Sequence, residues 1–227
     1  MKITLPEQVE IDIPSSQTKT MLIVSGGRAP SLKWLKAIAP DKKICCVDHG
    51  IDACKAADIL PDFLFGDNDS ASSESWDWAE THNVTINKYP REKDLTDTQL
   101  ALLQTAGNNV ILTGAFGGRL DHLFSNVHSF AAADITGIIA DEQELLVPLK
   151  GPAKLSMKFF RQPKAISLLS ITEKCRQVST TGLKWELTAT DLYQANPYTV
   201  SNEQKKGTDT ITVSTSAGVL GVYVFWE

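Results

Sequence analysis

The sequence predicts an N-terminal α/β domain with a mostly parallel sheet, followed by an all-β C-terminal sandwich. Up to residue 140, short apolar runs alternate with segments of helical spacing, which is the pattern of βαβ units. After Gly151 and Pro152 the helical spacing disappears. Short β-type runs follow, separated by Pro, Gly, Asn and charged residues. We therefore expect two domains, residues 1–150 and residues 151–227.

The first domain is expected to have a Rossmann-like alternation of strands and helices. Residues 3–13 fit either a short edge strand or an arm, and the sequence leaves both open. The apolar run 21–24 is short enough for a buried strand, and Pro30 introduces a helix over 32–38. The same reasoning gives strands over 44–47, 63–65, 84–86, 110–112, 138–140 and 144–147, and helices over 51–60, 72–82, 100–103 and 120–133.

The second domain is expected to contain strands only, because its apolar runs are short and rich in β-branched and aromatic residues. Turn residues bound these runs at intervals typical of an antiparallel sandwich or barrel. The expected strands cover 154–160, 165–169, 175–180, 183–187, 198–200, 210–215 and 219–226.

The composition argues against several classes of function. The formal net charge is -5 and no dense stripe of Lys and Arg occurs, so we expect no nucleic-acid partner. No apolar run approaches the ~20 residues of a bilayer span, and the N-terminus has no signal-peptide core, so we expect no membrane partner. The four cysteines show no Cys-x-x-Cys and no zinc spacing, which indicates reduced thiols and a cytoplasmic protein.

The segment Gly66–Ser70 is the most informative stretch of the chain. It follows the apolar run 61–65, and a buried parallel strand ending there places carboxylates where open α/β sheets bind ligands. Asp67 and Asp69 are two residues apart, so in extended backbone both side chains share a face and can hold one cation. The alternative is an ordinary turn, because Gly, Asp, Asn and Ser are common turn residues.

Other expected strands also end in Gly or Asp. Because the carboxyl ends of parallel strands meet at one edge of the sheet, that edge is the expected binding site. Gly26 and Gly27 lie between a strand and a helix, which suits a phosphate bound by backbone N–H groups, although a plain tight turn explains them as well. The strand ends concerned are Ser25-Gly26, Asp48, Gly66-Asp67 and Thr113-Gly114.

A charged loop precedes the helix expected near residue 100. Asp94 and Asp97 are three residues apart at the helix start, which suits either a binding site or a capping box. Lys93 beside them is either a ligand contact or a solvated surface charge.

The motif 117–122, Gly-Gly-Arg-Leu-Asp-His, follows another expected strand. Its two glycines allow the backbone to approach a ligand closely. The planar fork of Arg119 suits phosphate oxygens, since it can bind two of them at once. Asp121 fits three roles, which are orienting Arg119, holding a metal-bound water and capping the helix.

Gathering Asp48, Asp67, Asp69 and Asp97 at one edge has an electrostatic cost. Two carboxylates ~4 Å apart repel by about 4 kcal/mol at an effective dielectric of about 20. A hard divalent cation removes this cost, and oxygen ligands alone indicate Mg²⁺ rather than zinc. Since Mg²⁺ normally bridges substrate phosphates, these residues indicate Mg-nucleotide chemistry and phosphoryl-type transfer.

These motifs occur in the order found in the thiamine pyrophosphokinase family, which the chain resembles over residues 21–225. Two C-terminal segments, 181–185 and 200–203, are also similar to the family's signatures. The family patterns Asp-Gly-Gly, Gly-Asp-x-Asp-Ser, Lys-Asp-x-Thr-Asp and Gly-Gly-Arg-x-Asp-His correspond to residues 48–50, 66–70, 93–97 and 117–122.

The resemblance implies an enzyme that transfers pyrophosphate from Mg-ATP to the hydroxyl of thiamine and releases AMP, a thiamine diphosphokinase. It implies Mg²⁺ as cofactor, ATP as co-substrate and a homodimer with its active site at the subunit interface. In that arrangement the C-terminal domain of one chain covers the thiamine bound on the other.

The motifs and the resemblance together assign roles to individual residues. Asp67, Asp69 and Asp97 are the expected metal ligands, and the expected catalytic residues are these three with Arg119 and Asp121. The expected ATP-binding residues are Gly26, Gly27, Asp48, Lys93, Asp94, Gly118 and Arg119. The resemblance alone implies that Trp185, Ser201 and Asn202 bind thiamine. Trp185 also fits the core, and Ser201-Asn202 also fits a turn.

Two positions depart from the family patterns, and other functions stay open. His49 replaces a glycine, so the backbone there is expected to approach a ligand less closely, and Asn68 occupies a slot that is often apolar. The alternatives are a related ATP-dependent transferase with another small alcohol acceptor and a non-catalytic thiamine- or nucleotide-binding protein. A phosphohydrolase is disfavoured, because its Asp nucleophile normally follows the first strand, where this chain has Ser25-Gly26-Gly27.

Overall fold

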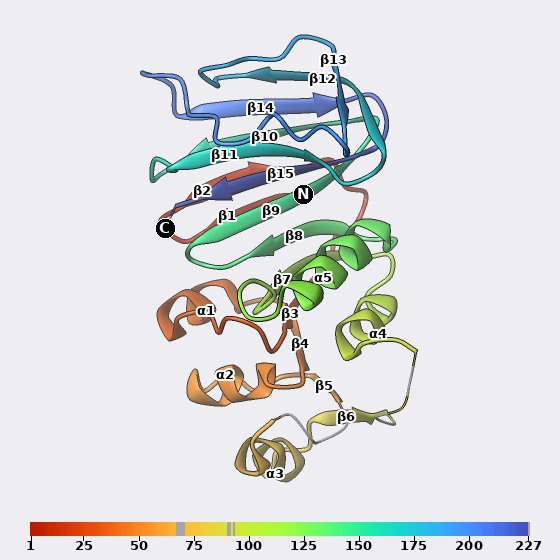
Figure 1. Cartoon of the computed structure of the whole chain (residues 1–227). Helices are drawn as coiled ribbons and strands as arrows, with labels where there is room; N and C mark the ends of the chain where they lie inside the picture. Colours follow the sequence, from red (N-terminus) through yellow and green to blue (C-terminus); the bar gives the residue numbers. More distant parts are fainter. Residues whose placement is uncertain (67–70, 90–91, 93, 227) are drawn as a thin grey trace. The chain divides into compact units, whose positions relative to one another are not determined.

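The computed structural model describes residues 1–66, 71–89, 92 and 94–226 (Figure 1). The chain divides into two compact units. Residues 17–141 form one, called the α/β unit below, and residues 1–16 with 142–227 form the other, called the β unit.

The α/β unit contains a sheet of parallel strands in the order β8-β7-β3-β4-β5-β6. Helices lie between successive strands, which confirms the predicted α/β region with a mostly parallel sheet. The strands are β3 (Thr20–Val24), β4 (Lys43–Val47), β5 (Phe63–Gly66), β6 (Thr85–Lys88), β7 (Asn109–Thr113) and β8 (Thr136–Ala140). The helices are α1 (Leu32–Ile38), α2 (Gly50–Ala56), α3 (Ser73–Thr81), α4 (Asp97–Gln104) and α5 (Leu120–Ala132).

The central strands of this unit are buried on both faces. Leu22, Ile23 and Leu112 are fully buried, since helices cover the sheet from two sides, with α4 and α5 on one side and α1 and α2 on the other (Figure 1). Burial on both faces explains why these strands are continuous apolar runs rather than alternating ones.

The strand order reverses at β3. The chain proceeds from β3 through β4 and β5 to the edge strand β6, and then returns to place β7 on the other side of β3. The carboxyl ends of β3 and β7 are therefore neighbours from which the chain leaves in opposite directions. Ligands of open α/β sheets bind at such a reversal point.

Polar side chains fix the starts of three helices. Ser31, Ser72 and Thr96 each accept a hydrogen bond from a backbone N–H in the first turn of α1, α3 and α4. Thr96 forms a capping box with Gln99, whose side-chain oxygen accepts from the Thr96 N–H at 2.8 Å. The capping-box interpretation of Asp94 and Asp97 is therefore wrong, because Thr96 is the N-cap and Asp97 is the first helical residue.

The β unit is built from antiparallel strands, which confirms the all-β prediction for the C-terminal region. One sheet has the order β1-β2-β10-β14-β12-β13, and β11, β15 and β9 pair in a second layer. The layers meet where β9 lies against β10 and β14, and the rings of Phe159 and Trp226 pack edge to face at 6.3 Å. The strands are β1 (Lys2–Leu5), β2 (Val9–Asp12), β9 (Glu144–Lys150), β10 (Ala153–Phe159), β11 (Ala165–Ser170), β12 (Lys174–Thr181), β13 (Thr190–Tyr193), β14 (Thr210–Thr215) and β15 (Val219–Phe225).

The division of the chain differs from the boundary expected after residue 150. The N-terminal segment belongs to the β unit because β2 pairs with β10, with Val9 opposite Phe159. Strand β9 belongs there too, since it pairs with β15 along its whole length. The alternating burial of β1 and β2 explains the first difference, because an amphipathic hairpin needs a second layer to cover its apolar face.

Two expected strands of the β unit are wrong, and one strand was not expected. Residues 183–187 and 198–200 form only isolated bridges and loops, whereas 190–193 forms β13. Gly182 has a φ of +78°, which turns the chain out of β12, and the side chains of Trp185 and Val200 are exposed. Apolar residues in these runs therefore do not mark a buried strand.

No helix in the described part of the chain has the length and apolar character that a membrane span requires.

We expect two glycine substitutions to separate backbone strain from steric clash. Gly114 has a φ of +67°, and a Cβ built on it lies 2.1 Å from the Ser25 carbonyl oxygen, whereas Gly107 has a φ of +73° and nothing within 4 Å. Gly107→Ala should lower the free energy of unfolding by about 1 to 2 kcal/mol. Gly114→Ala should lower it by about 3 kcal/mol or more, because the backbone must also move. Urea unfolding measures both, and equal losses would contradict the clash.

The cysteines give a second expectation. All four are free and buried, and the Sγ atoms of Cys46 and Cys54 are hydrogen-bonded at 3.2 Å. Burial raises the pKa of the Cys45 and Cys46 thiols, which lowers the fraction of reactive thiolate. An aromatic disulfide reagent should therefore titrate no thiol rapidly in the native protein and four in denaturant. A thiol that reacts rapidly before unfolding would show that one of these side chains is accessible.

Candidate functional site

A cleft of about 670 Å³ lies in the α/β unit where the carboxyl ends of β3, β4 and β7 meet. It therefore occupies the reversal point of the strand order. Its lining includes seven residues that sequence analysis assigned to ATP or metal binding, namely Gly26, Gly27, Asp48, Asp94, Asp97, Gly118 and Arg119. It also includes Ser25, His49, Leu95, Thr96, Thr98, Ala115, Gly117, His122 and Asn126.

Backbone hydrogen bonds join the two loops that form the floor of the cleft. The N–H groups of Ser25, Gly27 and Arg28 donate to the carbonyl oxygens of residues 113, 114 and 116, at 2.8, 2.6 and 2.7 Å. A Cβ on Gly27 would lie 2.6 Å from the Gly114 oxygen, so only glycine permits this approach. The Gly27 N–H is thus used within the protein, whereas the Gly26 N–H has no partner among the described residues and is available to a ligand.

An ion pair anchors the first of these loops. Nε and Nη2 of Arg28 both donate to Oδ2 of Asp141, at 2.9 and 2.6 Å. Asp141 is only 1% exposed, so the pair is shielded from water on the carboxylate side. The Arg28 guanidinium also lies 6.0 Å from the ring centroid of Phe116 in the second loop. Arg28 therefore helps to hold the two loops of the cleft floor together.

Asp48 leaves β4 in an unusual backbone conformation that directs it to the end of β5. Its φ is +50°, which asparagine and aspartate tolerate better than most residues, and its N–H donates to the Phe65 oxygen at 3.0 Å. A Cβ built on Gly66 would lie 2.9 Å from the Asp48 Oδ1 atom. The Asp48 carboxylate therefore lies beside the last residue of β5, immediately before the position of Asp67 in the sequence.

Asp97 provides the second carboxylate of the cleft wall. It is the first residue of α4 and is 9% exposed, and a helix N-terminus favours negative charge there. The neighbouring Thr98 hydroxyl lies 3.1 Å from the Ser25 hydroxyl, a contact that ties α4 to the end of β3. Asp48 and Asp97 thus reach one cleft although they are far apart in the sequence.

Arg119 and Asp121 form an exposed ion pair at the rim. Nε and Nη2 of Arg119 donate to the two Asp121 oxygens, at 3.1 and 2.5 Å. The hydrogen bond from Arg119 lowers the pKa of Asp121 to about 2, so Asp121 is charged near neutral pH. Arg119 lines the cleft and Asp121 does not, which agrees with an orienting role for Asp121 among the three considered.

Three assigned residues, Asp67, Asp69 and Lys93, lie outside the described residues. Within the described ranges no group of three or more His, Cys, Asp or Glu side chains is close enough to hold a metal ion. The carboxylates that line the cleft, those of Asp48, Asp94 and Asp97, have the oxygen chemistry that Mg²⁺ prefers. The residues in the cleft therefore fit Mg²⁺ better than a softer metal.

The three residues assigned to thiamine lie in the β unit and are close to one another. The Asn202 side chain hydrogen-bonds both the N–H and the carbonyl of Trp185, at 3.2 and 2.8 Å. Ser201 has a φ of +58°, and its N–H donates to the Ser167 hydroxyl at 3.0 Å. The Trp185 side chain is 56% exposed, so it is a surface residue and not part of the core.

Some residues of the cleft were not assigned from the sequence. Thr98 directly follows Asp97, so proximity to a charged motif was an available signal. Asn126 lies within α5 and donates to the Ala115 oxygen at 3.4 Å, and no local pattern marks it. His49 lines the cleft, and its Nδ1 lies 3.3 Å from an Asp52 oxygen, so the departure from the glycine pattern places an imidazole at the site.

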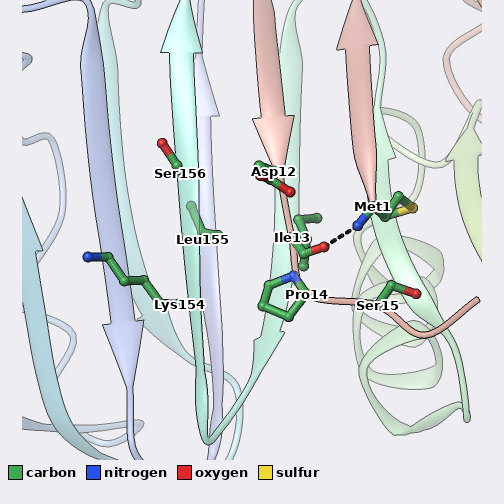
Figure 2. Close-up of a pocket in the computed structure, with 8 residues that line it drawn as sticks. All are labelled: Met1, Asp12, Ile13, Pro14, Ser15, Lys154, Leu155 and Ser156. Carbon is green, nitrogen blue, oxygen red and sulfur yellow. Dashed lines mark hydrogen bonds between the residues drawn. The ribbon is translucent and has the colours of Figure 1, made fainter.

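Figure 2 shows a second hollow, of about 390 Å³, in the β unit. The Met1 ammonium donates to the Ile13 oxygen across it, and the side chains of Asp12 and Lys154 do not point toward one another. Its walls come from strands β2 and β10 and the segment after β2. Since it gathers no cluster of charged or nucleophilic side chains, the cleft of the α/β unit is the candidate active site.

Comparison with known proteins identifies the family of both parts of the chain. Residues 35–139 match the family model "Thiamin pyrophosphokinase, catalytic domain", and residues 154–220 match "Thiamin pyrophosphokinase, vitamin B1 binding domain". Thiamine pyrophosphokinase of Bacillus subtilis is 27% identical over 192 residues, which cover 82% of this chain and 89% of that protein.

Solved structures extend the similarity to the fold. A crystal structure of the Bacillus subtilis protein superposes with a TM-score of 0.80 at 24% identity, covering 92% of this chain and 100% of that one. A structure of thiamin pyrophosphokinase from Geobacillus thermodenitrificans gives a TM-score of 0.73 at 27% identity, covering 92% and 98%. The two matched models together cover more than half of the chain, the resemblance seen in its motifs is confirmed, and the protein belongs to the thiamin pyrophosphokinase family.

Proposed function

We propose that the protein transfers a pyrophosphoryl group from Mg-ATP to the hydroxyl of thiamine, which yields thiamine diphosphate and AMP. The observation that carries the proposal is the meeting of Asp48, Asp97, Arg119 and the available Gly26 N–H in one cleft at the strand reversal. Carboxylates that hold a cation, beside groups that bind phosphate oxygens, suit a metal-bound triphosphate.

The residues of the cleft have separate roles in this proposal. Phosphate oxygens are bound by Gly26, Lys93, Gly118 and Arg119. Asp121 orients the guanidinium of Arg119. Asp48 and Asp94 line the nucleotide and metal region. Asp67, Asp69 and Asp97 would hold Mg²⁺, which would supply positive charge against the triphosphate.

The transfer forms one bond and breaks one bond at the β-phosphorus. The thiamine hydroxyl oxygen attacks in line, the bond from the bridging oxygen to the β-phosphorus breaks, and AMP leaves with that oxygen. The hydroxyl proton passes to a carboxylate of the cleft or to water. Arg119 stabilises the negative charge that develops on the phosphate oxygens, since its guanidinium is already held in place by Asp121.

The second substrate, the quaternary state and the location complete the proposal. Trp185, Ser201 and Asn202 belong to the part of the chain that matches a vitamin B1 binding domain, and we assign them to thiamine. A homodimer with the active site at the subunit interface, and a cytoplasmic location, remain predictions. The four free, buried thiols suit a reducing compartment.

The products test the reaction type. Incubation with ATP, Mg²⁺ and thiamine should give AMP and thiamine diphosphate in a ratio near one, because the whole β,γ unit is transferred. Ion-exchange chromatography separates these products from ADP and thiamine monophosphate. Formation of ADP with thiamine monophosphate would mean that the enzyme is an ordinary kinase.

Asp97 tests the metal assignment. Asp97→Asn should lower kcat by about a hundredfold or more, since it removes a charged metal ligand while keeping the side-chain shape. The affinity for thiamine, measured by calorimetry, should change by less than about threefold, because Asp97 is assigned to the metal and not to thiamine. Asp77→Asn makes the same exchange at an exposed position on α3 and should leave kcat unchanged. Normal turnover by Asp97→Asn would refute the assignment.

A further inference from the structure

The backbone of Asn202 is fixed by the edge of a strand. Its N–H donates to the Ile166 oxygen at 2.9 Å, and its own carbonyl accepts from the Ile166 N–H at 2.8 Å. Ile166 lies in β11 and is fully buried, so this bridge attaches Asn202 to the core of the β unit. The side chain of Asn202 therefore projects from a rigid position.

That side chain takes the place of a neighbouring strand for Trp185. Just before it, Leu183 bridges to Gln204, and the Lys184 N–H donates to the Glu203 oxygen at 2.8 Å. At Trp185 the backbone pairing ends, and the Asn202 amide accepts from the Trp185 N–H and donates to the Trp185 carbonyl. A carboxamide supplies both an acceptor and a donor, whereas a carboxylate supplies acceptors only.

The acceptor capacity of the Asn202 amide is also used inside the protein. Its oxygen accepts a second hydrogen bond, from the Glu203 N–H at 2.8 Å. The oxygen has two lone pairs and both have partners. One amide hydrogen bonds to Trp185, and the second has no partner among the described residues. A ligand that donates a hydrogen bond to the Asn202 oxygen would therefore compete with bonds that hold the loop.

The Trp185 indole is exposed to solvent and is not packed in the core. It is 56% exposed, and no second aromatic ring of the described residues stacks on it. The Lys184 ammonium lies 4.5 Å from the ring centroid and is paired with Glu203 at 3.0 Å. A large exposed aromatic side chain whose backbone is held at both polar groups suits stacking against a planar ring.

We infer that Asn202 is a positioning residue that acts on thiamine through Trp185 and does not itself contact the substrate. The inference rests on the proposed function for the identity of the substrate. The planar rings of thiamine are the chemistry that an exposed indole recognises, and fixing the indole in advance lowers the cost of ordering it on binding.

A double-mutant cycle in the full-length chain tests the inference. Asn202→Ala should raise the KM for thiamine about tenfold, which corresponds to about 1.4 kcal/mol, with kcat within about twofold of wild type. Trp185→Ala should raise it at least as much. In the Trp185→Ala background, Asn202→Ala should have no further effect, because the residue it positions is gone. A further rise in KM in that background would show direct contact and overturn the inference.

Trp185 fluorescence supplies a readout without substrate. The emission of Trp185 is obtained by subtracting the spectrum of a Trp185→Phe partner from that of each variant, since the chain has five tryptophans. Asn202→Ala should make Trp185 more accessible to acrylamide quenching, and Asn202→Asp, which keeps the acceptor and loses the donor, should lie between Asn202→Ala and wild type. Unchanged quenching in Asn202→Ala would overturn the inference.

Two controls separate this result from other effects. Asn196→Ala makes the same exchange at an exposed position that has no hydrogen bond to Trp185 among the described residues, and it should leave quenching and KM unchanged. If Asn202→Ala does not fold by circular dichroism, Asn202→Asp carries both measurements. If the wild-type protein does not convert thiamine, the proposed function fails, and the quenching comparison still decides whether Asn202 positions Trp185.

Discussion

The shape of the candidate active site depends on the backbone pairing between residues 25–28 and 113–116. Strands β3 and β7 are neighbours in the sheet, and their hydrogen bonding continues past the strand ends into the loops. This continuation requires glycine at 27 and at 114, since a Cβ at either position would strike the facing backbone. The floor of the cleft is thus an extension of the sheet and shares its rigidity.

The other groups of the cleft are placed relative to this floor. The Arg28–Asp141 ion pair anchors the loop of residues 25–28. The hydroxyl contact between Ser25 and Thr98 holds the start of α4 against this loop. Asp97 is carried by that helix start. Binding groups supplied by loops and helix ends therefore acquire fixed positions from a sheet that was itself set by apolar burial.

The same physical device occurs in the β unit in a different form. There the backbone pairing of residues 183 and 184 ends before Trp185, and the Asn202 side chain forms the hydrogen bonds to the Trp185 backbone. In both units, a residue assigned to a substrate uses its polar groups in hydrogen bonds within the protein. An assignment to ligand binding has to be checked against this internal use, as the occupied N–H of Gly27 illustrates.

Sequence reasoning was strongest where local pattern and burial agree. The apolar run 21–24 became β3 nearly unchanged, and Asp48 could be placed at the binding edge because parallel strands share their carboxyl ends. Asp97 begins a helix, and its assignment came from the family motif. It failed where partners are distant. The exposed run around Trp185 has strand composition but no partner sheet, and neither periodicity nor composition indicates that Asn202 holds Trp185. The capping-box alternative for Asp94 and Asp97 also failed, because the backbone geometry makes Thr96 the N-cap.

The N-terminal hairpin of β1 and β2 has a consequence for the order of assembly during synthesis. Strand β2 pairs with β10, with Val9 opposite Phe159. The hairpin therefore cannot form this pairing until β10 has been synthesised. The whole α/β unit, residues 17–141, is translated in between and closes a long loop. A nascent chain therefore has a complete parallel sheet available before its own first strands acquire their neighbour.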